Sequence, residues 1–91
     1  GEIQMGILTL VIVFIGMYFA ADFGRRQAQS FTASIQPNWL RVLADAFAWG
    51  LSASVAGLIL GSLLGMAVPF FNWLILFTVI DFVFGMIRSN R

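Results

Sequence analysis

The segment Ala53–Gly65 reads A-S-V-A-G-L-I-L-G-S-L-L-G and carries a small residue at every fourth position: Ala53, Gly57, Gly61 and Gly65. Residues four apart lie on nearly the same face of a helix. A helix with this sequence therefore has a face almost free of side chains, to which another helix can pack closely. In lipid, close packing is a main source of helix association, because lipid tails already solvate large apolar side chains. The stripe fits contact between two helices of one chain and, equally, contact between copies of the chain.

The composition around this segment is that of a membrane protein. The chain has 91 residues, of which 60% are hydrophobic and 10% are charged. Soluble domains carry about a quarter charged residues, and a soluble domain this small could not bury so much apolar surface. The sequence therefore predicts a single integral domain over residues 1–91, with the lipid bilayer as its first partner.

Three apolar runs predict an all-α membrane protein with three transmembrane helices, at about residues 3–22, 46–68 and 69–87. Each is about as long as a hydrocarbon core of roughly 30 Å requires. Their Val, Ile and Phe residues would favour strands in water, but an open strand in lipid cannot satisfy its backbone groups. The second run contains the small-residue stripe. Pro69 ends it, and the third helix begins near this proline, which is tolerated in a first helical turn.

The stretch between the first two runs, Asp22 to Gln36, reads D-F-G-R-R-Q-A-Q-S-F-T-A-S-I-Q and is expected to form a polar cytoplasmic loop, which could include a short surface helix. After it, Asn38 is expected to cap a helix, and Arg41 lies four residues before Asp45, with which it could pair. Amphipathic rings favour the headgroup level of a membrane. Three tryptophans are expected there: Trp39, Trp49 and Trp73.

Arginine placement predicts the orientation of the chain. Positive residues near membrane helices mark the cytoplasmic side. Three crossings put all five arginines on that side: Arg25, Arg26, Arg41, Arg88 and Arg91. The N-terminus and the turn at Pro69 then lie outside, and the C-terminus lies inside. An alternative keeps the first apolar run on the membrane surface and leaves only the two later runs spanning.

Asp81 is the candidate for intramembrane chemistry, because an ionisable group inside a span is costly and often functional. It could be hydrated near the interface or paired with Arg88, Arg25 or Arg26. It could also line a polar lumen or serve as an ion or proton site. A glycine-striped helix followed by a carboxylate-bearing helix resembles the rotary-ATPase proteolipid hairpin, although that family has a charged loop where this chain has P-F-F-N.

Other chemistry finds no support in the sequence. The chain contains no Cys, His or Lys, so it offers no nucleophile–base pair and no thiolate or imidazole metal ligands. It has no phosphate-binding loop and no dinucleotide fingerprint. A net charge of +1 gives no electrostatic basis for nucleic-acid binding. The sequence therefore predicts a protein that is not an enzyme and has no catalytic, cofactor or metal site.

Two segments carry a resemblance to a known family. Arg41 to Leu60, R-V-L-A-D-A-F-A-W-G-L-S-A-S-V-A-G-L-I-L, and Thr78 to Arg88, T-V-I-D-F-V-F-G-M-I-R, resemble helices of the small three-span bacteriophage holins of the P2 and lambda types respectively. The resemblance implies an N-out, C-in protein of the bacterial cytoplasmic (inner) membrane that self-assembles and permeabilises this membrane for host-cell lysis. The stripe would then drive oligomerisation.

A structural role is the alternative. Respiratory, photosynthetic, secretion, pilus and virion complexes contain small accessory subunits with two or three spans and no chemistry. In that case the stripe would contact partner membrane helices, and Asp81 would pair with a partner's arginine. An ion channel or a proton-carrying proteolipid is a further alternative.

Overall fold

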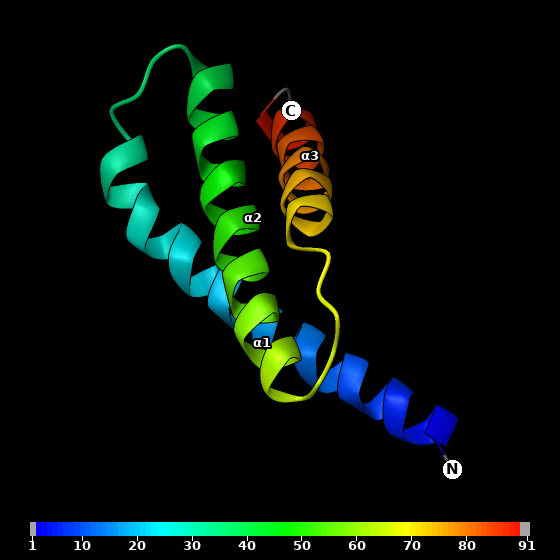
Figure 1. Cartoon of the computed structure of the whole chain (residues 1–91). Coiled ribbons are helices and arrows are strands. Elements are labelled where there is room, and N and C mark those ends of the chain that lie inside the picture. The colour runs from blue at the N-terminus through cyan, green and yellow to red at the C-terminus, as the bar shows by residue number, and fades with distance from the viewer. Residues whose placement is uncertain (1, 90–91) are drawn as a thin grey trace.

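The computed structural model describes residues 2–89, with side chains described from Gly6 onward, as three α-helices: α1, Glu2–Thr32; α2, Asn38–Leu63; and α3, Phe70–Ser89 (Figure 1). No strand occurs in that range. Each helix contains an apolar segment that is long and hydrophobic enough to cross a membrane. The predicted all-α fold of an integral membrane protein with three helices is confirmed.

The first helix is longer than the sequence predicted. α1 continues ten residues beyond Asp22 to Thr32, so the expectation of a loop from Asp22 is wrong, and the connection is only residues 33–37. The polar segment contains Gln, Ala and Arg, which are good helix formers, and no proline. An ion pair four residues apart, between Asp22 and Arg26 at 2.9 Å, adds support within the helix.

The second helix ends earlier than predicted, at Leu63 rather than at residue 68. Gly65 has φ +79°, the Met66 N–H donates to the Gly61 carbonyl at 2.7 Å, and the Gly65 N–H donates to the Ser62 carbonyl at 3.1 Å. This is a Schellman motif, which needs a left-handed residue that glycine supplies without a Cβ clash. Gly65 therefore ends the helix instead of belonging to its packing stripe.

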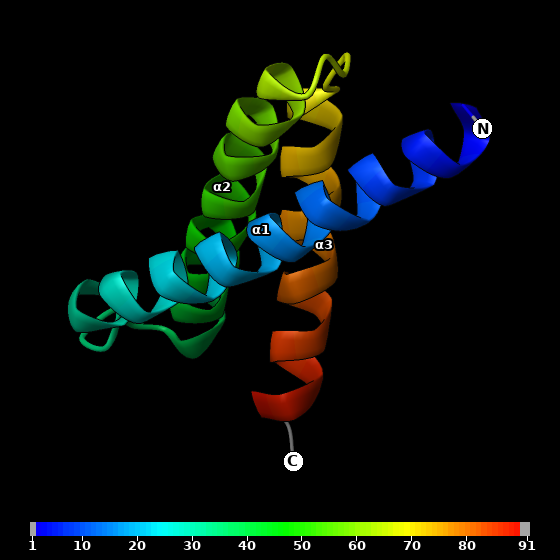
Figure 2. The ribbon, with the colours of Figure 1, turned by 90° about the horizontal axis from the view of Figure 1, so that it is seen from below.

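The helices run up, down and up, with α2 in the centre (Figure 1). α2 packs against both α1 and α3, whereas α1 and α3 have no direct backbone packing. Figure 2 shows α1 crossing the α2–α3 hairpin obliquely, so that its N-terminal turns extend beyond it. The N-terminal end of α1 and the 64–69 turn lie at one end, and the 33–37 connection and the C-terminal end of α3 lie at the other.

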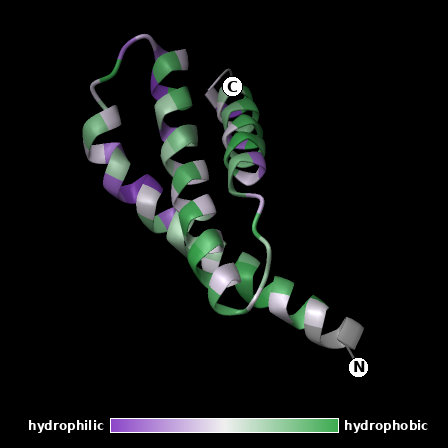
Figure 3. Ribbon diagram, in the orientation of Figure 1, coloured by the Kyte–Doolittle hydropathy of each residue, from purple (hydrophilic) through white to green (hydrophobic). Residues whose placement is uncertain are grey.

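The interior contains mostly small residues, together with Val13 and Met17. The core joins Val13, Met17 and Ala21 of α1 to Ala53 of α2. Large apolar side chains, such as Phe19 at 67% exposure, point outward. Hydrophobic residues cover most of the helices, and hydrophilic ones gather toward the end with the 33–37 connection (Figure 3). Small residues inside and large apolar residues outside fit a chain whose solvent is lipid. The buried residues of α2 are Ala46, Gly50, Ala53, Ser54, Gly57 and Gly61.

Candidate functional site

The small-residue stripe is in contact within one chain. A Cβ atom on Gly57 would lie 2.8 Å from both the Met17 Sδ of α1 and the Trp73 Cζ3 of α3. Gly57 is therefore the point where all three helices meet. A Cβ on Gly61 would lie 2.5 Å from Val68 Cγ2, so Gly61 faces the returning 64–69 turn. In this structure the stripe packs the chain against itself, which was one of the two interpretations the sequence left open.

Sequence reasoning missed a close approach between α2 and α3 at Gly50. A Cβ there would lie 3.0 Å from the Thr78 backbone nitrogen and 3.3 Å from the Leu74 carbonyl oxygen. Gly50 lies four residues after Ala46 and seven before Gly57, so helical spacing would have extended the stripe toward the N-terminus. Both Gly50 and Ala46 are buried.

Asp81 of α3 forms an ion pair with Arg25 of α1, one of the three partners that the sequence left open. Their side chains are only 12% and 22% exposed, and the Arg25 guanidinium lies 5.5 Å from the ring centroid of Trp49. Cation–π contact of this kind stabilises a partly desolvated guanidinium. The Arg25 Nε is buried without a hydrogen-bond partner among the described residues. The pair thus places two charges between the helices.

A second set of polar contacts joins the helix ends nearby. The Thr32 hydroxyl donates to Asp45 Oδ1 at 2.5 Å. Arg41 donates to the Asn38 side chain, which donates in turn to the Ser89 hydroxyl. The expected pair between Arg41 and Asp45 is therefore not formed. Asn38 is not a cap either, because α2 begins at Asn38 itself and Pro37 occupies the cap position without a side-chain hydrogen bond.

These contacts surround a polar crevice between the three helices, with a volume of about 260 Å³. Its lining residues lie toward the end of the molecule that holds the 33–37 connection and the end of α3. Two positive and two negative side chains line it, so its lining has no net charge. The lining residues are Arg25, Gln29, Val42, Asp45, Asp81, Gly85 and Arg88.

The other arginines lie outside this crevice. Arg26 is exposed and paired with Asp22 on the outer side of α1. Arg41 is in the first turn of α2, next to the 33–37 connection. Arg91 lies outside the described residues. The described arginines therefore belong to the C-terminal half of α1, the start of α2 and the end of α3, as the predicted three crossings require.

Two of the three tryptophans, Trp49 and Trp73, make aromatic contacts with a neighbouring helix. Trp73 is 5.5 Å from Phe14 and 6.4 Å from Phe77, and Trp49 is 6.0 Å from Phe77, measured between ring centroids. Trp39, in contrast, is half exposed. The expectation that all three tryptophans act as interfacial anchors did not anticipate these interior contacts, because periodicity alone does not show which helix a ring faces.

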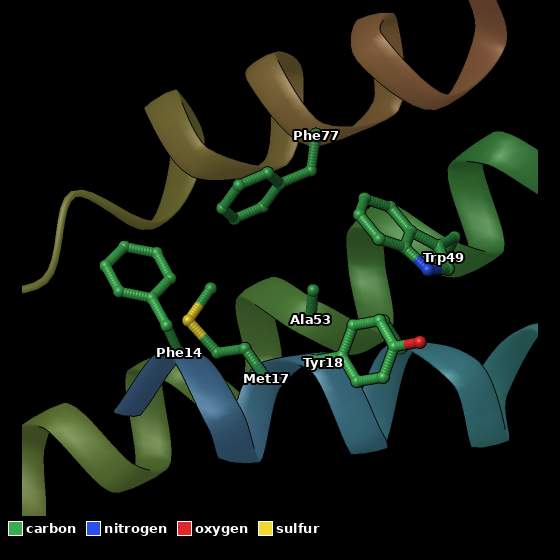
Figure 4. Close-up of a pocket in the computed structure, with 7 residues that line it drawn as sticks. Phe14, Met17, Tyr18, Trp49, Ala53 and Phe77 are labelled. Carbon is green, nitrogen blue, oxygen red and sulfur yellow. The ribbon is translucent and has the colours of Figure 1, made fainter. Parts of the chain in front are cut away.

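An apolar cavity of about 190 Å³ lies beside this aromatic row. Figure 4 shows rings from all three helices around it, with Met17 and Ala53 between them. The cavity contains no charged lining residue. Its lining consists of Phe14, Met17, Tyr18, Ala21, Trp49, Ala53 and Phe77.

Two hydroxyls are also hidden between the helices. Ser54 Oγ and Thr78 Oγ1 are buried and have no hydrogen-bond partner among the described residues. Burial of an unpaired hydroxyl costs about 1–3 kcal/mol, so buried polar groups are normally paired. Together with Arg25 and Asp81 they make the interior more polar than a simple three-helix anchor needs.

The described residues contain no group of three or more His, Cys, Asp or Glu side chains placed to hold a metal ion. The chain matches no protein-family model, no curated protein and no solved structure.

Proposed function

We propose that this chain is a holin-like protein that self-assembles in the bacterial cytoplasmic membrane and permeabilises it for phage lysis, with its N-terminus outside and its C-terminus inside. The observation that supports this most is the polar interior of a bundle whose exterior is apolar. Arg25 and Asp81 are paired there, and the hydroxyls of Ser54 and Thr78 are buried without partners.

The structure corresponds in this proposal to the closed state. Charges are paired and hydroxyls are hidden, so single copies can disperse in lipid. α1 and α3 lack backbone packing, and their ion pair joins them through side chains alone. Movement of α1 away from α3 would expose Arg25 and Asp81. Because polar groups facing lipid are costly, several copies would then gather these faces around water.

The same movement would release the small-residue stripe. Ala53 and Gly57 contact α1 in the closed state, and they would become free to contact another copy once α1 moves away. The same small residues would therefore pack within the monomer in the closed state and between copies in the assembly. In lipid such an exchange requires no new apolar burial, since packing rather than water exclusion drives association.

Expression of this chain alone in a bacterium tests the proposal, with growth and membrane potential followed over time. An abrupt collapse after a quiet interval is expected. Ser54→Ala removes a buried hydroxyl and should change the time of collapse, whereas Ser62→Ala, on the exposed side of the same helix, should not. Continued growth with the intact protein in the membrane would refute the proposal.

A non-catalytic accessory subunit is the second candidate. It is favoured by the N-terminal turns of α1, which extend beyond the hairpin and expose Ile7 at 58% and Leu8 at 54% (Figure 2). Such a subunit would leave growth unaffected and would co-purify with a larger complex through this part of α1. We propose no ion-carrying role, because Arg25 already pairs with Asp81.

A further inference from the structure

The polar crevice between the helix ends combines charges of both signs in a small space. Arg25 and Asp81 already form an ion pair. Asp45 of α2 and Arg88 of α3 remain, one acidic and one basic, and both line the same cavity of about 260 Å³. Arg88 forms no ion pair with any carboxylate among the described residues. The cavity therefore presents one available charge of each sign.

Asp45 keeps part of its hydrogen-bonding capacity. It accepts the Thr32 hydroxyl through Oδ1, which leaves Oδ2 for another donor. This bond also fixes the orientation of the carboxylate. Gly85 lines the crevice on α3, one turn before Arg88, and the Val42 side chain of α2 packs closely against it, since a Cβ on Gly85 would lie 2.6 Å from Val42 Cγ1.

A ligand of a single charge fits this lining poorly. An anion would meet Asp45 and Asp81, and a cation would meet Arg25 and Arg88. A zwitterion can satisfy both signs. Arginine binds phosphate through paired N–H donors, and a primary ammonium offers three N–H donors to a carboxylate. The lining residues of the crevice belong to the C-terminal part of α1, the first turns of α2 and the last turns of α3. Hydrophilic residues gather toward the same end of the molecule (Figure 3), as expected at the level of lipid headgroups.

We propose that this crevice binds the phosphoethanolamine headgroup of a membrane phospholipid, with the phosphate at Arg88 and the primary ammonium at Asp45. The acyl chains remain in the surrounding bilayer. The ion pair between Arg25 and Asp81 forms the inner end of the site and keeps its charges balanced. This lipid site does not depend on the proposed lytic function.

Native mass spectrometry of the purified full-length chain in detergent tests the site. The probes are phosphatidylethanolamine, phosphatidylcholine and phosphatidylglycerol with identical acyl chains. The ethanolamine lipid should be retained about tenfold more strongly than the other two, because only its ammonium can donate a charged hydrogen bond to Asp45. Choline has no N–H donor for Asp45, and glycerol has no cation. This comparison needs no variant and so does not depend on any variant folding.

Variants then locate the site. Arg88→Gln and Asp45→Asn should each weaken retention of the ethanolamine lipid about tenfold, because each removes one charged partner. Asp45→Asn should in addition abolish the preference over phosphatidylcholine. The matched controls are Arg26→Gln and Asp22→Asn, which make the same charge changes in an exposed pair on the outer side of α1 and should change nothing.

Three results would overturn the proposal. Equal retention of the three lipids would show that the crevice does not discriminate between headgroups. Preference for phosphatidylglycerol that survives Asp45→Asn would show a purely anionic site. Binding of water-soluble glycerophosphoethanolamine as strong as that of the lipid would show that the ligand is a soluble metabolite rather than a membrane lipid.

Discussion

Arg25 of α1 and Asp81 of α3 form an ion pair between two helices whose backbones do not pack directly on each other. The two residues are 56 positions apart in sequence. Their pairing, beneath the ring of Trp49, ties the outer helices of the bundle together through side chains.

Asp81→Asn should destabilise the bundle by about 1–3 kcal/mol, less than a fully buried pair because both side chains retain some exposure. The variant leaves the Arg25 guanidinium between the helices without its carboxylate. The free energy of unfolding in mixed detergent micelles measures the effect. Asp22→Asn, in the exposed pair with Arg26, should cost less than about 0.5 kcal/mol.

The double variant Arg25→Gln with Asp81→Asn separates loss of the pair from loss of the carboxylate. It should recover most of the stability lost in Asp81→Asn, since no unpaired charge remains. Equal destabilisation by the single and the double variant would contradict the view that an unpaired arginine causes the loss.

Gly57→Leu should separate the helices, because even a Cβ at this position would lie 2.8 Å from atoms of Met17 and Trp73. Overpacking of this kind costs about 1–3 kcal/mol or more. The control is Gly6→Leu on α1, where nothing lies within 4 Å. Thermal stability in detergent should fall for Gly57→Leu and not for Gly6→Leu. An equal fall for the two variants would contradict the close contact of Gly57 with α1 and α3.

Gly65→Ala should cost about 1 kcal/mol, because an alanine disfavours the left-handed conformation that ends α2. Gly6→Ala, within a helix, should be neutral or slightly stabilising. The same unfolding measurement in micelles checks both. No loss for Gly65→Ala would indicate that α2 continues past Leu63, as the sequence alone suggested.

Cysteine pairs can test the arrangement of the helix ends, since the chain has no native cysteine. Asn38→Cys combined with Ser89→Cys should form a disulfide in membranes, because these side chains are hydrogen-bonded in the structure. The pair Gly6→Cys and Ser89→Cys joins opposite ends and should remain reduced (Figure 1). Cross-linking of the second pair within one chain would rule out the up-down-up arrangement.

Single cysteines test the orientation. Ala67→Cys, in the 64–69 turn, should react with a membrane-impermeant maleimide in intact spheroplasts, and Ala33→Cys should react only after the membrane is opened. The expectation follows from the arginines gathered near the 33–37 connection and the end of α3. The reverse labelling pattern would place the N-terminus in the cytoplasm.

The sequence by itself determined that the chain lies in a lipid membrane and that its fold is all-α. Long apolar runs with few charges require helices that satisfy their own backbone groups in lipid, and this constraint acts residue by residue. It was enough to predict three helices and the small face formed by Ala53, Gly57 and Gly61. It did not find the helix ends at Thr32 and Leu63, because the first depended on weak propensities and the second on the backbone conformation of Gly65.

The tertiary structure decided which residues meet. The crossing of α1 over the hairpin brings Arg25 to Asp81. The packing of α2 on α3 places Asp45 in the crevice that also contains Arg88. Only the approach of α3 shows that Gly50 completes the small face of α2. Helical periodicity assigns a residue to a face, but it does not determine which helix covers that face. The partners of each charge and glycine were therefore fixed by packing between segments that are distant in sequence.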